Sequence, residues 1–408
     1  MGNPIFLINF AEKSNDRYMT RLWILATAVL FSTVQPAAAQ TAEKPRGVAG
    51  LLSKLGSLLD TMAVKGVDRN YIEAPKHPWQ VILKGNINQS VLKLDSKVDA
   101  SSMFTDVVSD LFWEPTIKTD PSTYAGVWAG YRGYGIGYSW NVGGDKGSIL
   151  TFGATGGSYG VNLRIHTFWN DEPEVHYAGS FILDNDPSAQ PTYVSQTAKV
   201  PLERPIRTRT VLCDAYYMFN GKRFSYAAAY DQSVIQKRSA GSLMVGALFY
   251  YSHVNYAEDE NADFILLMDN IGRIKQWQVS LGAGYAYNLV PCKGLLISAM
   301  AMPMLTVYDR YKTWRFDSNY REMALDNIAH DDDDLPQSEW RLKDEPLSVS
   351  DNHSRLTLNV DARLSLTYQW KRFFINAFGQ YSRFRYKDGA VKGTLSDWYI
   401  NAALGVRF

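Results

Sequence analysis

Apolar and polar residues alternate along several segments of the chain. In the longest run, from Arg355 to Trp370, every second residue is apolar and each residue between is polar. Successive side chains of a β-strand point to opposite faces, so this pattern predicts a strand with one apolar and one polar face. The run is longer than an average soluble strand. It is typical of a strand tilted across a membrane, which needs about 9–11 residues.

The alternation recurs often enough to predict an all-β protein. It is clear in residues 134–142, 159–166, 223–231 and 276–289, and weaker strands are expected to begin near Trp79, Glu174, Arg207, Ser242, Gly294 and Phe373. Because closed bacterial barrels have an even number of strands, we expect an antiparallel up-and-down β-barrel of about 12 strands, within a range of about 10–14. The division into strands between residues 123 and 168 stays open at this stage.

The connections between the strands differ in length and polarity. Tight turns are expected at residues 290–294 and 369–372, whereas residues 91–122, 253–272 and 309–353 are long and polar. Outer-membrane barrels have short periplasmic turns and longer extracellular loops, so we expect these three segments to be extracellular. Residues 219–224 also form a tight turn, which conflicts with a strict up-and-down order in the middle of the chain.

Three features favour a transmembrane barrel over a soluble one. Small residues such as Gly282 and Gly284 lie on a polar face, where they suit a crowded lumen. Aromatic residues gather at strand ends, as in an interfacial girdle. The last residues alternate from Trp398 to the terminal Phe408, which resembles the signal that the bacterial barrel-assembly machinery recognises. A barrel in the bacterial outer membrane is therefore predicted.

The N-terminal residues predict export. Arg21 precedes a short apolar run, residues 22–34, and small residues follow at 37–39. This is the order of a cleaved signal peptide, and the apolar run is too short for a spanning helix. We expect residues 1–39 to be leader and signal peptide, with Met19 as the true start and cleavage near Ala39. A periplasmic segment, residues 40–78, and the barrel, residues 79–408, then follow.

The periplasmic segment contains a second pattern. Apolar residues recur at helical spacing between residues 48 and 62, which predicts a short amphipathic helix. Plain packing against the barrel is the default interpretation. The alternatives are that the helix plugs the lumen or lies on the inner leaflet surface.

Overall composition excludes some classes of function. The 42 basic and 41 acidic residues give a net charge of +1, so no polyanion-binding surface is indicated and no nucleic-acid partner is expected. Aromatic residues make up 13% of the chain, which suits a membrane barrel. The two cysteines, Cys213 and Cys292, do not form a disulfide framework and are expected to be unpaired, with no metal-ligand spacing.

Three segments resemble a known family. They are residues 67–73, 217–226 and 236–242, which are turn and strand patterns. Together they resemble the Bacteroidetes outer-membrane barrels described as domain of unknown function 4421, over residues 65–408. The resemblance implies a barrel in the outer membrane. It brings no activity, cofactor or catalytic residue.

Charged residues on the polar faces are the candidate functional residues. They are expected to line the lumen, where charges must be paired or hydrated whether or not a solute passes: Lys84, Arg164, Asp214, Arg223, Asp231, Asp361, Arg363 and Asp397. Two histidines beside serines, His253 and His353, are candidates for a hydrolase, but solvated loop histidines are the simpler interpretation. The acidic run 331–334 lacks the turn glycine of a dedicated calcium loop and is interpreted as solvated.

The sequence leaves three functions open. The leading hypothesis is a narrow or plugged channel for small polar solutes. The alternatives are a non-transporting structural or surface-binding barrel, acting through residues 309–353, and an outer-membrane lipid hydrolase. We expect no enzymatic activity, cofactor or metal. The expected partners are outer-membrane lipid, lipopolysaccharide and the barrel-assembly machinery, and the oligomeric state is left open.

Overall fold

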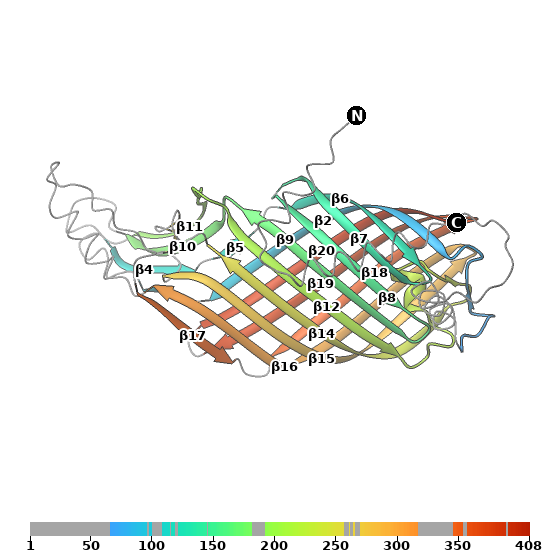
Figure 1. Ribbon diagram of the computed structural model, residues 1–408. Helices are drawn as coiled ribbons and strands as arrows, with labels where there is room; N and C mark the ends of the chain where they lie inside the picture. Colours follow the sequence, from blue (N-terminus) through green and yellow to red (C-terminus); the bar gives the residue numbers. More distant parts are fainter. Residues whose placement is uncertain are drawn as a thin grey trace, which may run out of the picture. The chain divides into compact units, whose positions relative to one another are not determined.

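The computed structural model contains a closed antiparallel β-barrel (Figure 1). It describes residues 66–95, 98–99, 108–114, 116–118, 121–144, 146–181, 192–256, 261, 264–265, 270–316, 346–353, 357–388 and 391–408. These residues belong to one compact unit, residues 62–408. The expected signal peptide and the amphipathic helix at residues 48–62 lie outside the described residues.

Twelve strands form the barrel wall, which confirms the predicted number. Each strand pairs with the next wall strand along the chain, and the first pairs with the last, from Gln80 opposite Arg407 to Asp95 opposite Lys392. The wall strands are β2 (Trp79–Asp95), β6 (Ser122–Tyr131), β7 (Tyr134–Gly143), β8 (Gly147–Thr155), β9 (Tyr159–Asn170), β12 (Ile206–Met218), β14 (Ala240–Asn255), β15 (Ile271–Cys292), β16 (Leu295–Phe316), β18 (Leu358–Trp370), β19 (Phe373–Asp388) and β20 (Val391–Arg407).

The remaining elements lie outside this ring of pairings. A four-stranded sheet has the order β11-β10-β4-β3, β5 pairs with β2, and β17 pairs with β16. A short ladder joins β1 to β13. These elements are β1 (Ile72–Glu73), β3 (Val98–Asp99), β4 (Val108–Glu114), β5 (Thr116–Lys118), β10 (Glu174–Phe181), β11 (Thr192–Lys199), α3 (Tyr226–Tyr230), β13 (Ile235–Gln236) and β17 (Leu347–His353).

The polar face of the wall points inward, as it does in membrane barrels and not in soluble ones. On β18, Leu364 is 60% exposed, whereas Asp361 and Thr367 are fully buried. Other large apolar side chains are exposed in the same way on the outer face, including Leu83, Leu281, Leu404 and Ile400. Apolar side chains on the outer face and polar side chains on the inner face are typical of a wall that is solvated by lipid.

The two ends of the barrel are built differently. Short turns connect the strands at one end, at Arg132–Gly133, Cys292–Gly294 and Lys371, where positive φ angles let the chain reverse sharply. Phe408 at the C-terminus pairs with Trp79 at the same end. The sheet containing β10, β11 and β4, together with β17, lies at the other end (Figure 1). The short turns are therefore periplasmic and the long connections extracellular.

Two sequence expectations need correction, and one open question is answered. Residues 223–231 are not a wall strand, because residues 226–230 form the helix α3 and Asp231 caps its C-terminus. The strand near Glu174 exists as β10, but it belongs to the extracellular sheet and not to the wall. The region 123–168, left open above, contains four wall strands, β6, β7, β8 and β9.

No helix within the described part of the chain is long and apolar enough to cross a membrane.

Candidate functional site

The lumen contains a plug, which we define as residues 219–239. It connects β12 to β14 and includes α3 and β13. The Ser225 hydroxyl accepts a hydrogen bond from the Ala228 amide and thereby caps the helix. Ala227, Ala228 and Ala229 are buried, with Ile72 and Leu296 beside them. The tight turn at 219–224 thus starts a segment that folds into the barrel, and the up-and-down order of the wall is kept.

The plug is hydrogen-bonded to strands all around the wall. Gln80 of β2 donates to the Asp231 carbonyl, and Thr155 of β8 donates to the Asp231 carboxylate. Asn288 of β15 donates to the Ser225 carbonyl. Additional donors come from β18 and β20, through Ser365 to Ala229 and Arg407 to Gln232. Contacts to so many strands fix the plug in one position.

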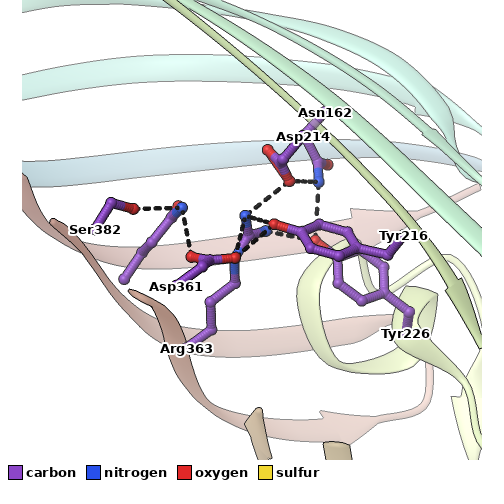
Figure 2. A network of polar contacts seen from close by, with 8 residues as sticks. Asn162, Asp214, Tyr216, Tyr226, Asp361, Arg363 and Ser382 are labelled. Atoms are coloured by element: carbon purple, nitrogen blue, oxygen red, sulfur yellow. Dashed lines mark hydrogen bonds and ion pairs between the residues drawn. The ribbon is translucent and has the colours of Figure 1, made fainter. Parts of the chain in front are cut away.

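Arg363 on β18 stands at the centre of a polar network that crosses the lumen (Figure 2). Its Nη2 donates to Asp214 Oδ2 on β12 over 2.7 Å, and its Nη1 donates to the Tyr226 hydroxyl of α3 over 2.6 Å. Nη2 also contacts the hydroxyl of Tyr216, which donates to Asp361 Oδ2 over 2.6 Å. The network joins two walls that are separated by β14, β15 and β16, and it holds the plug between them.

Neighbouring amides complete the Arg363 network. Asn162 Nδ2 donates to Asp214 Oδ2 over 2.9 Å and to the Tyr226 hydroxyl over 2.8 Å. Gln380 Nε2 donates to Asp361 Oδ1 over 3.3 Å. The side chains of Arg363, Asp214 and Asp361 are 3%, 5% and 0% exposed. Such buried charges are tolerated only when they are paired and hydrogen-bonded, as they are here.

A second ion pair crosses the lumen between Arg164 on β9 and Asp397 on β20. These strands are separated by β8, β7, β6 and β2. The Arg164 guanidinium also lies over the ring of Tyr399, whose hydroxyl donates to Asn86. The Arg164–Asp397 pair therefore connects a different pair of strands across the lumen from the pair that Arg363 connects.

Apolar side chains fill part of the remaining lumen. One buried cluster combines methionines with aromatic and aliphatic residues from the inner faces of β12, β14, β16 and β19. Tyr250 and Phe384 stack within it, with ring centroids 4.7 Å apart. The methionines are Met218, Met244, Met300, Met302 and Met304. Flexible thioether side chains suit such an irregular interior.

A cavity of about 120 Å³ lies between the plug and the wall. Lys84 of β2 lines it, with its ammonium 4.2 Å from the centre of the Trp128 ring. Asp231 lines the same cavity, and burial raises the pKa of its carboxyl, although hydrogen bonds from Ser233 and Thr155 oppose the shift. Arg164 and Arg363 also reach the cavity wall. The cavity can hold a few water molecules or a small polar solute.

The structure places the eight candidate residues in different surroundings. Lys84, Arg164, Asp214, Asp361, Arg363 and Asp397 project from wall strands toward the lumen, where five of them form the two ion-pair groups. Asp231 is also buried in the lumen, but it comes from the plug and not from a strand. Arg223 does not line the lumen. It lies in the turn at the periplasmic end, is 57% exposed and pairs with Asp68 at 3.9 Å.

The candidate hydrolase residues do not form a catalytic pair among the described residues. Ser252 and His253 are adjacent on β14 and so point to opposite faces of the wall. His353 Nδ1 contacts the Asp309 carbonyl at 3.1 Å, and Ser354 lies outside the described residues. No cluster of metal-binding side chains occurs in the described part of the chain, and the acidic run 331–334 lies outside it.

Sequence reasoning missed the neutral members of the Arg363 network. Tyr216 and Asn162 lie on the same inward faces as Asp214 and Arg164, so strand parity could have found them. Tyr226 could not be found in this way, because it belongs to the plug. The cap signal Ser225 before three alanines was the available clue to a helix there.

The comparisons with known proteins identify a family and assign no activity. A family model described as Domain of unknown function (DUF4421) matches residues 67–408. None of the curated proteins matches the sequence.

Solved structures of outer-membrane proteins resemble the chain only distantly. The outer-membrane protease OmpT from Escherichia coli is 10% identical, with 82% of this chain and 97% of that chain covered and a TM-score of 0.27. The P. putida toluene transporter TodX is 8% identical, with 82% and 91% covered and a TM-score of 0.27. OprG from Pseudomonas aeruginosa is 11% identical, with 84% and 99% covered and a TM-score of 0.24. At these values the likeness supports no argument about function.

Proposed function

The chain belongs to the family described as Domain of unknown function (DUF4421), and we propose its function from the structure of its lumen. The protein is a closed barrel of the bacterial outer membrane that conducts no solute in its folded state. It acts as a scaffold for a binding surface at its extracellular end. The observation that carries this proposal is the Arg363 network, which ties two walls and the plug together across the lumen.

The size of the barrel supports closure. Barrels of about 8 strands are filled by side chains, whereas those of about 16–18 strands leave an aqueous channel. A barrel of 12 strands has a wider interior, and here the plug and the methionine cluster occupy it. The ion pairs of Arg363 and Arg164 cross the lumen between two different pairs of strands. A solute would have to break buried ion pairs to pass.

The extracellular end supports a binding role. Two separate connections contribute strands to one sheet there, because β4 follows β2 whereas β10 and β11 follow β9. Strand β11 forms an edge of that sheet, and almost all its residues are exposed, with Tyr193 at 66%. An exposed strand edge offers main-chain hydrogen bonds to an added strand. Ordered connections of this kind are common where loops bind other molecules.

The test is single-channel conductance of the mature protein, from Gln40 onward, refolded into a planar bilayer. The wild type is expected to insert without producing current steps. A variant in which residues 225–233 are replaced by a Gly/Ser linker is expected to conduct, because the plug is gone. A matched control puts the same type of linker into the connection between β14 and β15 and is expected to stay silent. Stable steps from the wild type would contradict the proposal.

A second candidate is a plugged channel for small polar solutes. The cavity between the plug and the wall favours it, because Lys84, Arg164 and Asp231 give that cavity groups of both charges. Under this alternative the wild type produces ion-selective steps, and Lys84→Gln shifts their preference toward cations. The same bilayer measurement therefore separates the two candidates.

A further inference from the structure

Basic residues gather on the outward face of four neighbouring wall strands, near their extracellular ends. The strands are β12, β14, β15 and β16, and the residues share the face of exposed apolar side chains lower on the same strands, such as Tyr217 and Leu281. We call this group the basic belt: Arg207, Arg209, His253, Arg273, Lys275, Arg310 and Lys312.

Basic side chains stand directly opposite one another in the basic belt, and Lys275 and Lys312 form a pair of like charges. Arg209 pairs with His253, His253 with Lys275, and Lys275 with Lys312, so that one row crosses all four strands. Side chains opposite each other have Cβ atoms about 4.5–5.5 Å apart, and like charges at this separation repel. A second row, two residues nearer the strand ends, adds Arg207 on β12 and Arg273 on β15.

The basic belt lies just above the lipid-facing part of the wall. The row beneath it pairs Tyr251 with Trp277, whose ring centroids are 5.5 Å apart, and Trp277 with Arg310. Below that row the outer face turns apolar, with Phe249 and Leu281 exposed. Tyrosine and tryptophan mark the membrane–water interface in outer-membrane barrels. The charges therefore stand at the level of the lipid headgroups.

Within the described residues, acidic groups offset only one side of the basic belt. Asp351 of β17 accepts from Arg310 Nε over 2.8 Å and pairs with Lys312 at 3.2 Å. The other side has Lys275, whose ammonium lies 5.2 Å from the centre of the Trp314 ring, and the exposed side chains of Arg207 and Arg209. An excess of positive charge remains there and faces outward.

We propose that the basic belt binds the phosphorylated headgroup of an outer-leaflet lipid, one that carries more than one phosphate. Neighbouring strands are about 4.8 Å apart, so four strands extend the charges over roughly 14 Å, more than one phosphate spans. Arginine matches phosphate oxygens with two parallel hydrogen bonds. Bound phosphates would also relieve the repulsion between opposing strands. This inference concerns the outer wall and is independent of whether the lumen conducts.

The test is native mass spectrometry of the mature protein in detergent with bisphosphorylated lipid A. The variant Arg207→Gln/Arg209→Gln/Lys275→Gln removes charge from the side of the belt away from Asp351. Its control, Lys222→Gln/Lys293→Gln/Arg372→Gln, removes the same charge from exposed turns at the periplasmic end. Binding by the belt variant is expected to fall about tenfold or more, while the control binds as the wild type does. Lipid A with one phosphate, and phosphatidylglycerol, are expected to bind more weakly.

Two results would overturn the proposal. One is equal lipid A binding by the belt variant and the wild type. The other is equal binding of phosphatidylglycerol and bisphosphorylated lipid A, which would indicate an unselective anionic surface. Heat-modifiable migration in gels checks that each variant is folded. If the triple variant does not fold, Arg209→Gln and Lys275→Gln are measured singly, and each is still expected to weaken binding because each removes a charge from the same row.

Discussion

Replacing Arg363 with methionine provides a direct test of the lumen network. Methionine has nearly the same length as the arginine stem, so packing changes little while the guanidinium is lost. Asp214 and Asp361, whose side chains are 5% and 0% exposed, then keep their charges without a cation. Tyr216 and Tyr226 also lose their common hydrogen-bond partner.

The expected cost follows from burial. Removing one partner of a buried ion pair typically costs about 3–5 kcal/mol, because the remaining charge is left uncompensated. The amide of Asn162 still donates to Asp214, and both Gln380 and the Tyr216 hydroxyl still donate to Asp361, so neither carboxylate is left without a donor. We therefore expect Arg363→Met to lower the free energy of unfolding by about 3 kcal/mol, the lower end of that range.

The assay is a urea titration of the barrel folded in lipid vesicles, followed by tryptophan fluorescence. The triple variant Arg363→Met/Asp214→Asn/Asp361→Asn removes the stranded charges and is expected to recover about half of the loss, because replacing a whole buried ion pair is often nearly neutral. Arg372→Met, at an exposed turn, is the matched control and is expected to change stability by less than about 0.5 kcal/mol.

One outcome would refute the reasoning about the lumen. If Arg363→Met lowers the free energy of unfolding by less than about 1 kcal/mol, the carboxylates have found other partners or water. The network would then be hydrated rather than sealed. The Arg363 network would then not close the lumen.

Two further predictions concern the wall. Leu364→Arg puts a charge on the lipid face near the middle of β18 and is expected to lower the free energy of unfolding by about 2–4 kcal/mol in the same urea titration. Leu358→Arg, nearer the strand end, is expected to lower it by about 0–1 kcal/mol. Equal losses would argue against the assigned membrane depth. Gly405→Ala puts a Cβ into the ring of the fully buried Phe374 and is expected to lower the free energy of unfolding by about 1–3 kcal/mol. Gly379→Ala, whose added Cβ meets open space, serves as the control. A Gly405→Ala variant as stable as the wild type would contradict this packing.

The wall was predictable because lipid and lumen impose opposite demands on alternate residues. In β18 each apolar residue except Ala362 is large, so its alternation is unambiguous in the sequence. In β6 the contrast is weak. Small residues such as Ala125, Gly126, Ala129 and Gly130 occupy both faces, and the strand could not be separated from its neighbours. Alternation therefore predicts strands only where the two faces differ in size and polarity.

The interior was only partly predictable. Strand parity placed Asp214, Asp361 and Arg363 on inward faces, but it could not say which of them meet. That depends on which strands stand opposite one another, and so on strand number and stagger together. The plug was misread because Phe224, Tyr226, Ala228 and Tyr230 alternate with smaller residues over a short run, and short runs do not distinguish strand from helix.

The anchoring of the plug has a consequence for the order of folding. Gln80, in the first wall strand, and Arg407, in the last, both hydrogen-bond to neighbouring plug residues. The two bonds are present together only when the two ends of the chain have met, because β2 and β20 pair in the closed ring. The interior therefore reaches its final form after the wall does. A chain that lost β20 would keep most of its strands and still leave the Gln232 carbonyl of the plug without its Arg407 donor.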